Sequence, residues 1–297
     1  MTLVPSVTFA ELAAPARPAI EAALDRLSQP AAGCPGKLAE AMRYSLLAPA
    51  KRLRPLLVVM AAEACGGATD AALSAACAVE MIHTYSLIHD DLPAMDDDDL
   101  RRGRPTCHVV YGEAMAILAG DALLARAFEI IARDIRPAAV AAQSVALLAA
   151  AAGPAALVGG QADDLTSEGL GDLATLESIH ARKTGAMFLV SLQLGGLTAG
   201  ASPEQMLALE RYGRSMGLAF QIMDDLLDVS GNEQALGKRV GKDVDRGKLT
   251  FPALLGVSES RQRAEALVAN ACAALASLGP AAQGLEALAR YVLERDR

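Results

Sequence analysis

Two aspartate clusters are the parts of this sequence whose residue types and spacing most directly predict chemistry. One runs from Asp90 to Asp96 and the other from Asp224 to Asp228. On a helix, Asp224 and Asp228 would share one face, where their like charges repel each other unless a cation binds. Carboxylates without neighbouring His or Cys suit hard cations such as Mg²⁺, which often shares its ligands with substrate phosphates. The clusters therefore predict a site for Mg²⁺ and phosphate.

Pro93 determines how the first cluster can fold. Asp90 and Asp96 are six residues apart, so they would not share one face of a regular helix. Pro93 disrupts the helix between them, and a turn at this point would fold Asp96 back beside Asp90. Asp91 and Asp225, each next to one of these carboxylates, are candidates for groups that support the metal ligands.

Basic residues near turns would complete a diphosphate site. The chain has a formal net charge of −8 and no long Lys/Arg run, so its cations do not indicate a nucleic-acid surface. Arg suits forked contacts with phosphate oxygens and Lys suits point-charge contacts. His83 lies two helical turns before Asp90 and is a candidate hydrogen-bond donor to phosphate. The candidate cations are Lys51, Arg54, Arg101, Arg102, Lys183, Lys238 and Lys248.

Helices must position these groups. Aromatic residues make up only 3% of the chain and Trp is absent, whereas the helix formers Ala and Leu are abundant. A helix is expected over residues 71–91 and another over 138–152. Ser202, Pro203 and Gln205 form a capping-box pattern for a helix that runs to Asp228. The sequence predicts one all-α domain of roughly ten or more helices.

Cysteine content and hydropathy give expectations about location. The five cysteines are scattered, odd in number and form no CxxC motif, so neither a disulfide framework nor a zinc site is expected. The first residues lack the basic start and apolar block of a signal peptide. The most apolar stretch, residues 145–158, is interrupted by Gly153 and Pro154 and is too short to span a bilayer. A cytoplasmic protein without a membrane span is expected.

Several segments resemble bacterial farnesyl and geranylgeranyl diphosphate synthases. The stretch from Ile82 to Gly103 closely resembles the first aspartate-rich motif of these enzymes, and Phe220–Asp228 resembles the second. A lone DDxxD motif is weak evidence, but an ordered set of motifs over nearly the whole chain is highly specific. Further resemblances follow in the same order at Lys51–Pro55, Gly160–Gln161 with Asp164, Lys183–Gly185 and Gly237–Lys238.

The resemblance implies a fold and a cofactor. It implies that residues 1–297 form a single polyprenyl synthetase domain with the isoprenoid synthase fold, in which helices surround a deep central cavity. It implies a homodimer and three Mg²⁺ ions per active site. Asp90 and Asp96 would hold two of these ions, and Asp224, together with Asp228, would hold the third.

The resemblance also implies substrates and a reaction. The enzyme would join isopentenyl diphosphate to dimethylallyl or geranyl diphosphate by ionisation, condensation and proton elimination. The residues implied in catalysis are Asp90, Asp96, Arg101, Lys183, Asp224 and Lys238. The implied contacts to the allylic diphosphate are Arg101, Lys183, Thr184, Gln221, Lys238 and Lys248, and those to isopentenyl diphosphate are Lys51, Arg54, His83 and Arg102.

Tyr85 and Ser86 bear on the product length. Tyr85 precedes Asp90 by five residues, which is about 7.5 Å along a helix. In the family, a large aromatic residue here beside a small residue resembles farnesyl-producing enzymes, so (2E,6E)-farnesyl diphosphate is the expected product. An ordinary core role for Tyr85 stays open. Geranylgeranyl or geranyl diphosphate synthesis is the alternative.

Two departures from the family pattern and three rival functions need testing. Pro49-Ala50 replaces a common Gly-Gly, and Asp163 stands where an apolar residue is common, which adds charge near the cavity. A class I terpene cyclase would lack the second aspartate motif and the isopentenyl pocket. The pair His89-Asp90 would suit an HD-type phosphohydrolase only with further His ligands. An inactive dimer partner would tend to lose one aspartate motif.

Overall fold

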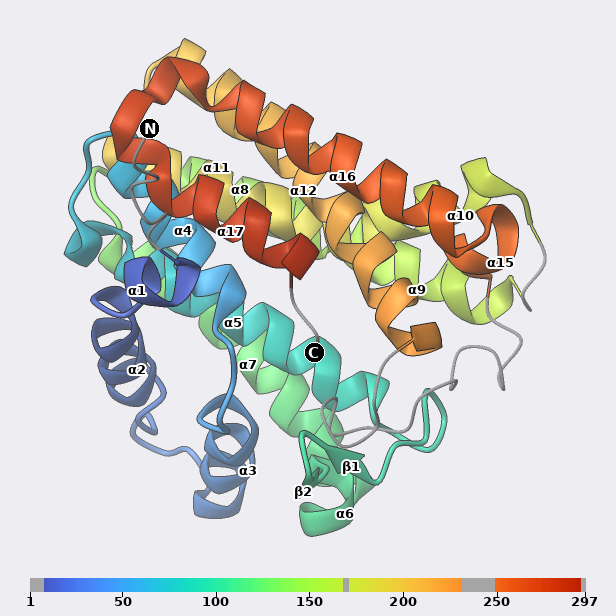
Figure 1. Ribbon diagram of the computed structural model, residues 1–297. Coiled ribbons are helices and arrows are strands. Elements are labelled where there is room, and N and C mark those ends of the chain that lie inside the picture. Colours follow the sequence, from blue (N-terminus) through green and yellow to red (C-terminus); the bar gives the residue numbers. More distant parts are fainter. Residues whose placement is uncertain (1–7, 168–170, 231–248, 295–297) are drawn as a thin grey trace.

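The computed structural model describes residues 8–167, 171–230 and 249–294, and their regular structure is almost entirely helical (Figure 1). The N-terminal helices are α1 (Phe9–Ala13), α2 (Ala16–Leu27), α3 (Gly36–Leu46) and α4 (Leu53–Ala64). The central helices are α5 (Thr69–Asp90), α6 (Cys107–Tyr111), α7 (Glu113–Asp134), α8 (Ala138–Ala152) and α9 (Leu157–Thr166). The remaining elements are α10 (Leu173–His180), the π-helical turn η1 (Ala181–Gly185), α11 (Ala186–Ala199), α12 (Pro203–Ser230), α15 (Phe251–Leu255), α16 (Val257–Ala274), the 3₁₀ segment η2 (Ala276–Ala282) and α17 (Gln283–Glu294).

One short hairpin is the exception to the helical structure. Strand β1 (Leu100–Arg101) pairs antiparallel with β2 (Arg104–Pro105), with Leu100 opposite Pro105. Arg102 and Gly103 form the turn, and both have positive φ angles. The hairpin follows the first aspartate cluster, and its Arg101 binds Asp91 of that cluster. The all-α prediction is otherwise confirmed.

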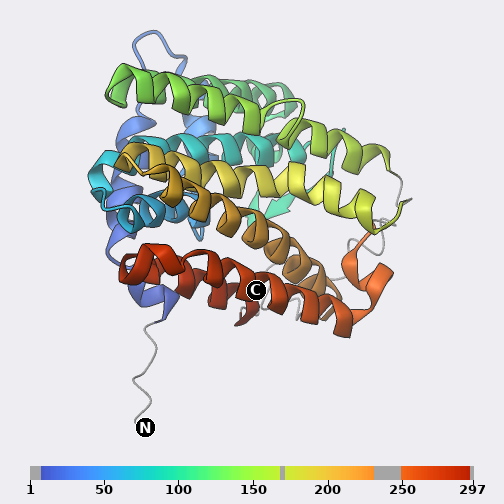
Figure 2. The same cartoon turned by 90° about the horizontal axis from the view of Figure 1, so that it is seen from above.

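Helix α5 lies at the centre of the bundle. It packs against α2, α3, α4, α7 and α11, and Figures 1 and 2 show it running alongside α7. A helix that is surrounded by others must be apolar on all sides. The residues of α5 that are buried include Ala72, Ala76, Val79 and Ile82. The predicted helix over residues 71–91 is therefore confirmed to within two residues.

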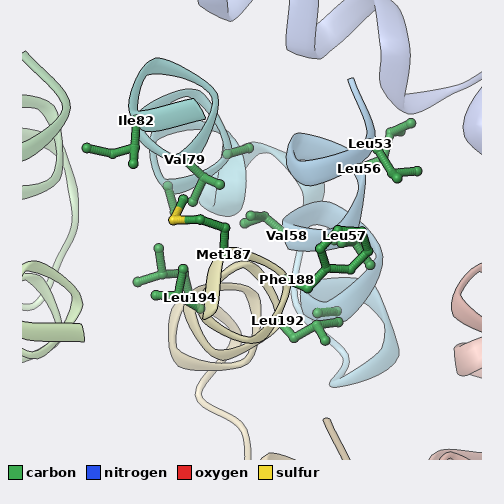
Figure 3. Packing of buried hydrophobic residues seen from close by; sticks show 14 of the residues in the cluster. Leu53, Leu56, Leu57, Val58, Val79, Ile82, Met187, Phe188, Leu192 and Leu194 are labelled. Atoms are coloured by element: carbon green, nitrogen blue, oxygen red, sulfur yellow. The ribbon is translucent and has the colours of Figure 1, made fainter. Parts of the chain in front are cut away.

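The core between α4, α5 and α11 fixes the frame around the site. Met187 and Phe188 of α11 pack beside Val58 of α4 and Val79 of α5 (Figure 3). Helices α4 and α11 approach so closely that a Cβ atom on Gly195 would lie 2.2 Å from the carbonyl oxygen of Val58. Only glycine fits this crossing.

Helix α12 begins at the capping box predicted from the sequence. The Gln205 backbone N–H donates to Ser202 Oγ at 3.3 Å, and the Ser202 N–H donates to Gln205 Oε1 at 2.9 Å. The helix then continues for 28 residues. It carries the second aspartate cluster at its C-terminal end, so the prediction of a long helix that ends in carboxylates is confirmed.

Two stretches are long and apolar enough to cross a membrane by length and composition alone. They are Thr69–Asp90, with 67% of its apolar window buried in the molecule, and Ala138–Thr166, with 33%. Two further helical segments, Val257–Ala274 and Ala276–Glu294, are long and apolar enough only if they are counted together as one span, and they are bent by 90° where they meet. The central position of α5 accounts for its hydropathy. Residues 145–158, the most apolar stretch of the sequence, comprise the end of α8, its connection to α9 and the start of α9.

Candidate active site

The turn after α5 brings the two ends of the first aspartate cluster together. The Asp96 N–H donates to the Asp90 carbonyl at 2.8 Å, and the Asp98 N–H donates to the Asp91 carbonyl at 3.2 Å. Pro93 lies within this loop, as expected of a residue that ends a helix. The prediction that Asp96 folds back beside Asp90 is confirmed.

Asp91 holds Arg101 in place. Its carboxylate accepts hydrogen bonds from Arg101 Nε at 2.9 Å and Nη2 at 2.6 Å, which is a forked ion pair. Asp91 is buried, with 3% of its surface exposed. Burial raises the pKa of Asp91, and the guanidinium opposes that effect. The ion pair with Arg101 agrees with the predicted supporting role of Asp91.

The negative charge of Asp90 is not fully balanced by the positive charges near it. Burial raises the pKa of Asp90 to about 6, and Asp96 raises it further, while Lys183 and Arg101 oppose the shift. An ionised carboxylate in this setting gains more than an exposed one from a bound cation. The site therefore fits a cation at Asp90.

The second cluster divides between the cavity and the interior. Asp224 and Asp228 both line a large cavity, as expected for residues four apart on one helical face. Gln221 Nε2 donates to Asp224 Oδ2 at 3.4 Å. Asp225 is buried and accepts a hydrogen bond from the Phe251 N–H at 2.9 Å, so it ties α12 to α15.

The cavity has a volume of about 780 Å³ and is lined by residues from five segments of the chain. The C-terminal ends of α5 and α12 lie at the same end of the bundle (Figures 1 and 2). Among the described residues, Asp90 and Asp96 do not line the cavity themselves; Arg101, which interacts with Asp90, does. The predicted site residues that line it are Lys51, Arg54, His83, Arg101, Arg102, Thr184, Gln221, Asp224 and Asp228.

Arg54 is a half-buried cation that lines the cavity. Its Nη1 lies 3.2 Å from His83 Nε2, and its guanidinium lies over the Phe188 ring at 5.6 Å. Burial lowers the pKa of Arg54 to about 10, so it stays charged at neutral pH, and Glu80 and Asp224 oppose the shift. Arg54 Nε is buried without a hydrogen-bond partner in the described part of the chain. A phosphate oxygen would satisfy this donor.

His83 is neutral in this environment. Burial lowers its pKa well below the ordinary value, and Arg54 and Arg102 lower it further. Because arginine only donates hydrogen bonds, His83 Nε2 accepts from Arg54, and the ring proton therefore resides on Nδ1. If His83 donates a hydrogen bond to phosphate, as predicted, the donor is therefore its Nδ1–H group.

Lys183 and Thr184 lie on η1, the π-helical turn between α10 and α11. Such turns often occur at functional sites because they redirect side chains within a helix. Lys183 Nζ binds Asp164 at 2.6 Å, whereas Arg182 binds Asp163. The unusual charge of Asp163 is therefore paired with Arg182. Lys238 and Lys248 lie outside the described residues.

Tyr85 and Ser86 do not line the cavity in the described structure. Tyr85 is only 6% exposed, and its ring meets His89 edge-on at a centroid distance of 5.7 Å. Ser86 Oγ donates to the His83 carbonyl at 2.9 Å. A role in product length therefore requires the alkyl tail to reach the Tyr85 ring.

The remaining histidines serve packing and local hydrogen bonds. His89 Nε2 lies 3.1 Å from the Ile117 carbonyl and 4.0 Å from Asp121 Oδ1, both on α7, and these contacts argue against an HD-type site. His108 pairs with Thr106, and His180 stacks on Phe251 at 5.7 Å. Within the described residues, no group of three or more His, Cys, Asp or Glu side chains could hold a metal by itself.

Sequence reasoning missed Glu80 and Arg52. Both are buried, with 3% of their surface exposed, and both line the cavity. Arg52 Nη1 donates to Glu80 Oε1 at 2.8 Å. One signal was present: Glu80 is a single acid in an otherwise apolar stretch of α5, and a buried acid requires a partner.

Comparison with known protein families and sequences identifies the relatives of the chain. Residues 35–279 match the polyprenyl synthetase family model. The chain is 49% identical over 283 residues to a dimethylallyltranstransferase of Fischerella ambigua, covering 94% of this chain and 81% of the relative. It is 50% identical over 249 residues to the farnesyl diphosphate synthase of Geobacillus stearothermophilus, covering 82% and 84%. It is also 50% identical over 267 residues to a chloroplastic geranylgeranyl pyrophosphate synthase of Catharanthus roseus, covering 88% and 75%.

Solved structures agree with these sequence relatives. An FPP/GFPP synthase from Zymomonas mobilis superposes with a TM-score of 0.82 at 39% identity, covering 95% of this chain and 99% of that one. The geranylgeranyl pyrophosphate synthetase of Pyrococcus horikoshii gives 0.87 at 34% identity, covering 97% and 98%. The expected isoprenoid synthase architecture is confirmed. The chain belongs to the polyprenyl synthetase family and is a short-chain prenyltransferase.

Proposed function

We propose that this prenyltransferase condenses isopentenyl diphosphate with dimethylallyl and then geranyl diphosphate to give (2E,6E)-farnesyl diphosphate. One observation carries the proposal: a single cavity is lined both by Asp224 and Asp228 and by the cations Lys51, Arg54 and Arg102. This arrangement supports two diphosphates in one site, one at the carboxylates through metal ions and one at the cations.

The donor chemistry fits Mg²⁺. The two aspartate clusters offer only carboxylate oxygens, and Mg²⁺ completes such sets with water and substrate phosphate. We infer three ions per site, two held by Asp90 and Asp96 and the third by Asp224 with Asp228. Bound Mg²⁺ would supply Lewis-acid stabilisation of the diphosphate leaving group.

The side chains around the allylic diphosphate would stabilise the charge that develops as the C–O bond breaks. We assign this role to Arg101, Lys183, Thr184 and Gln221, with Lys238 and Lys248 as further candidates from the sequence alone. Asp91 orients Arg101 through its forked ion pair. The hydrogen bonds strengthen as negative charge grows on the departing oxygen, so they favour the transition state over bound substrate.

Condensation then joins two carbon atoms without a protein base. Apolar cavity residues such as Leu87, Phe220 and Leu227 limit the access of water to the allylic cation. The double bond of isopentenyl diphosphate attacks this cation to give a new carbocation, which loses a proton to the released diphosphate and so forms the double bond of the product. The isopentenyl diphosphate itself would be held by Lys51, Arg54, Arg102 and neutral His83.

Product length is the finer part of the proposal. The farnesyl product rests on Tyr85, a bulky buried aromatic five residues before Asp90. Geranylgeranyl diphosphate is the second candidate, because relatives with each of these two products share 50% identity with the chain.

We further infer that residues 1–297 act as one domain in a cytoplasmic homodimer. The family model spans most of this range. All five cysteines are free thiols, as suits a reducing compartment. Helices α6 and α7 expose a set of apolar side chains that a second copy would cover: Val109, Val110, Ile117 and Leu118.

Incubation with isopentenyl and dimethylallyl diphosphates in Mg²⁺ tests the function. Mass spectrometry of the products is expected to show mainly the fifteen-carbon diphosphate, and the reaction stops in EDTA. Twenty-carbon product would favour the second candidate. Cyclised hydrocarbons or bare diphosphate hydrolysis without condensation would reject the proposal.

A further inference from the structure

Glu80 is a buried acid within a cavity rich in cations. It lies on α5, three residues before His83, with 3% of its surface exposed, and it lines the cavity with Lys51, Arg54 and Arg102. A carboxylate is an unexpected neighbour for a bound diphosphate because the two negative charges repel. Its direct partner is Arg52, which Glu80 Oε1 meets at 2.8 Å.

Arg52 is held on several sides and has an unusual backbone. Its guanidinium donates to Glu80 Oε1 and Glu21 Oε1 at 2.8 Å and to the Ala48 carbonyl at 3.0 Å. Its φ and ψ angles are 52° and 38°, which is the left-handed region that non-glycine residues rarely occupy. Such a conformation persists only when surrounding contacts fix it.

The left-handed turn determines where the neighbouring cations point. Arg52 is the N-cap of α4, so it separates Lys51 in the preceding loop from Arg54 in the first helical turn. Both of these side chains line the cavity. Arg52 also lines the cavity, and its guanidinium donates hydrogen bonds to Glu80 and Glu21.

We infer that the buried Glu80–Arg52 ion pair is a positioning device for isopentenyl diphosphate. It anchors the left-handed turn at Arg52, so that Lys51 and Arg54 face one cavity, and it neutralises Arg52 at the same time. This inference rests on the proposed isopentenyl role of Lys51 and Arg54. Helix α5 carries both Glu80 and His83, and His83 contacts Arg54 of α4. The ion pair therefore joins α5 to the start of α4, the two helices that form this pocket.

Glu80→Gln keeps the size of the side chain but removes its charge. It leaves Arg52, a buried cation, with Glu21 but without its buried carboxylate partner, and losing one partner of a buried ion pair is costly. We expect KM for isopentenyl diphosphate to rise about tenfold or more, while KM for the allylic substrate changes less than about twofold. Glu63→Gln on the exposed face of α4 is the matched control and is expected to leave both KM values unchanged.

Substitutions of Arg52 separate the ion pair from the turn. Arg52→Gly permits the left-handed backbone freely but removes the guanidinium. Arg52→Lys keeps the charge but loses the forked contacts. Both are expected to raise KM for isopentenyl diphosphate selectively, as Glu80→Gln does. Normal isopentenyl binding by Arg52→Gly would show that the turn alone suffices and would overturn the inference.

Thermal melts and one further variant complete the test. If Glu80→Gln does not fold, Glu80→Asp, which shortens the reach to Arg52, takes its place with the same expected KM split. A lowered Tm with both KM values unchanged, or an equal rise in both, would overturn the positioning role. Lys51→Gln checks the pocket itself. If only Lys51→Gln raises KM for isopentenyl diphosphate, the pocket stands and the ion-pair inference fails; if neither variant does, the proposed pocket is wrong.

Discussion

Replacing Asp90 by Asn is expected to stabilise the metal-free enzyme while abolishing its activity. Burial raises the pKa of Asp90 to about 6 from an ordinary value of 3.8. The folded state therefore binds a proton more tightly than the unfolded state. The cost of Asp90 to the fold grows as the pH rises from about 3.8 and is complete above about 6. Asn removes the charge and this cost, but it also removes a proposed metal ligand.

The size of the effect follows from the two pKa values. The difference between about 6 and 3.8 corresponds to at most about 3 kcal/mol at pH 7.5. Asp90 retains partial exposure, which reduces the gain, so about 1 to 3 kcal/mol is expected. For a chain of this length, about 2 °C of Tm accompanies each kcal/mol. Asp90→Asn should therefore melt about 2 to 6 °C above the wild type in EDTA.

Differential scanning fluorimetry in EDTA measures the stability of the metal-free protein. Addition of Mg²⁺ with pyrophosphate then measures how much the bound metal stabilises it. Mg²⁺ with pyrophosphate should raise the Tm of the wild type far more than that of Asp90→Asn. In EDTA, the difference between the two proteins should shrink as the pH falls from 7.5 towards 5. Asp99→Asn, whose side chain is 83% exposed, is the matched control and should leave Tm unchanged. An Asp90→Asn protein that melts at or below the wild type at pH 7.5 in EDTA would refute the reasoning.

Three other substitutions test separate parts of the structure. His83 has a pKa well below its ordinary value, so the folded protein resists protonation of this side chain and should lose stability as the pH falls below about 6.5. In denaturant titrations at pH 7.5 and 5.5, His83→Gln should reduce this dependence of the unfolding free energy on pH. Tyr85→Ala should shift the product from fifteen carbons towards twenty or more. An unchanged chain length in product analysis would exclude Tyr85 as the side chain that limits the length of the alkyl tail. Gly195→Ala places a Cβ 2.2 Å from the Val58 carbonyl and should cost about 2 kcal/mol or more of unfolding free energy, whereas Gly36→Ala, whose Cβ meets no atom within 4 Å, should cost almost none.

The parts of the fold set by local rules were predictable from the sequence. The capping box at Ser202 predicted the start of α12, and the apolar run before Asp90 predicted α5. Pro93 predicted the turn that folds Asp96 back beside Asp90. In each case the determining residues lie within a few positions of the feature that they produce.

The parts that depend on contacts between distant segments were not predictable. The Glu80–Arg52 pair joins residues 28 positions apart, and the Asp163–Arg182 pair joins residues 19 apart. No sequence pattern states that these charges meet. The π-helical turn at η1 also lacked a signal, because Ala181–Gly185 contains no residue that ends an α-helix outright. Product length stays a prediction for the same reason, since the path of the alkyl tail depends on packing around Tyr85.

The central claim is that the two aspartate clusters act on one diphosphate through shared metal ions. A crystal structure of the enzyme with Mn²⁺ and inorganic pyrophosphate, read by anomalous scattering, tests it most directly. Metal peaks bound by Asp90 and Asp96 and by Asp224, all bridged by the same pyrophosphate, are predicted. Metal at only one cluster, or pyrophosphate bound away from both, would contradict the account.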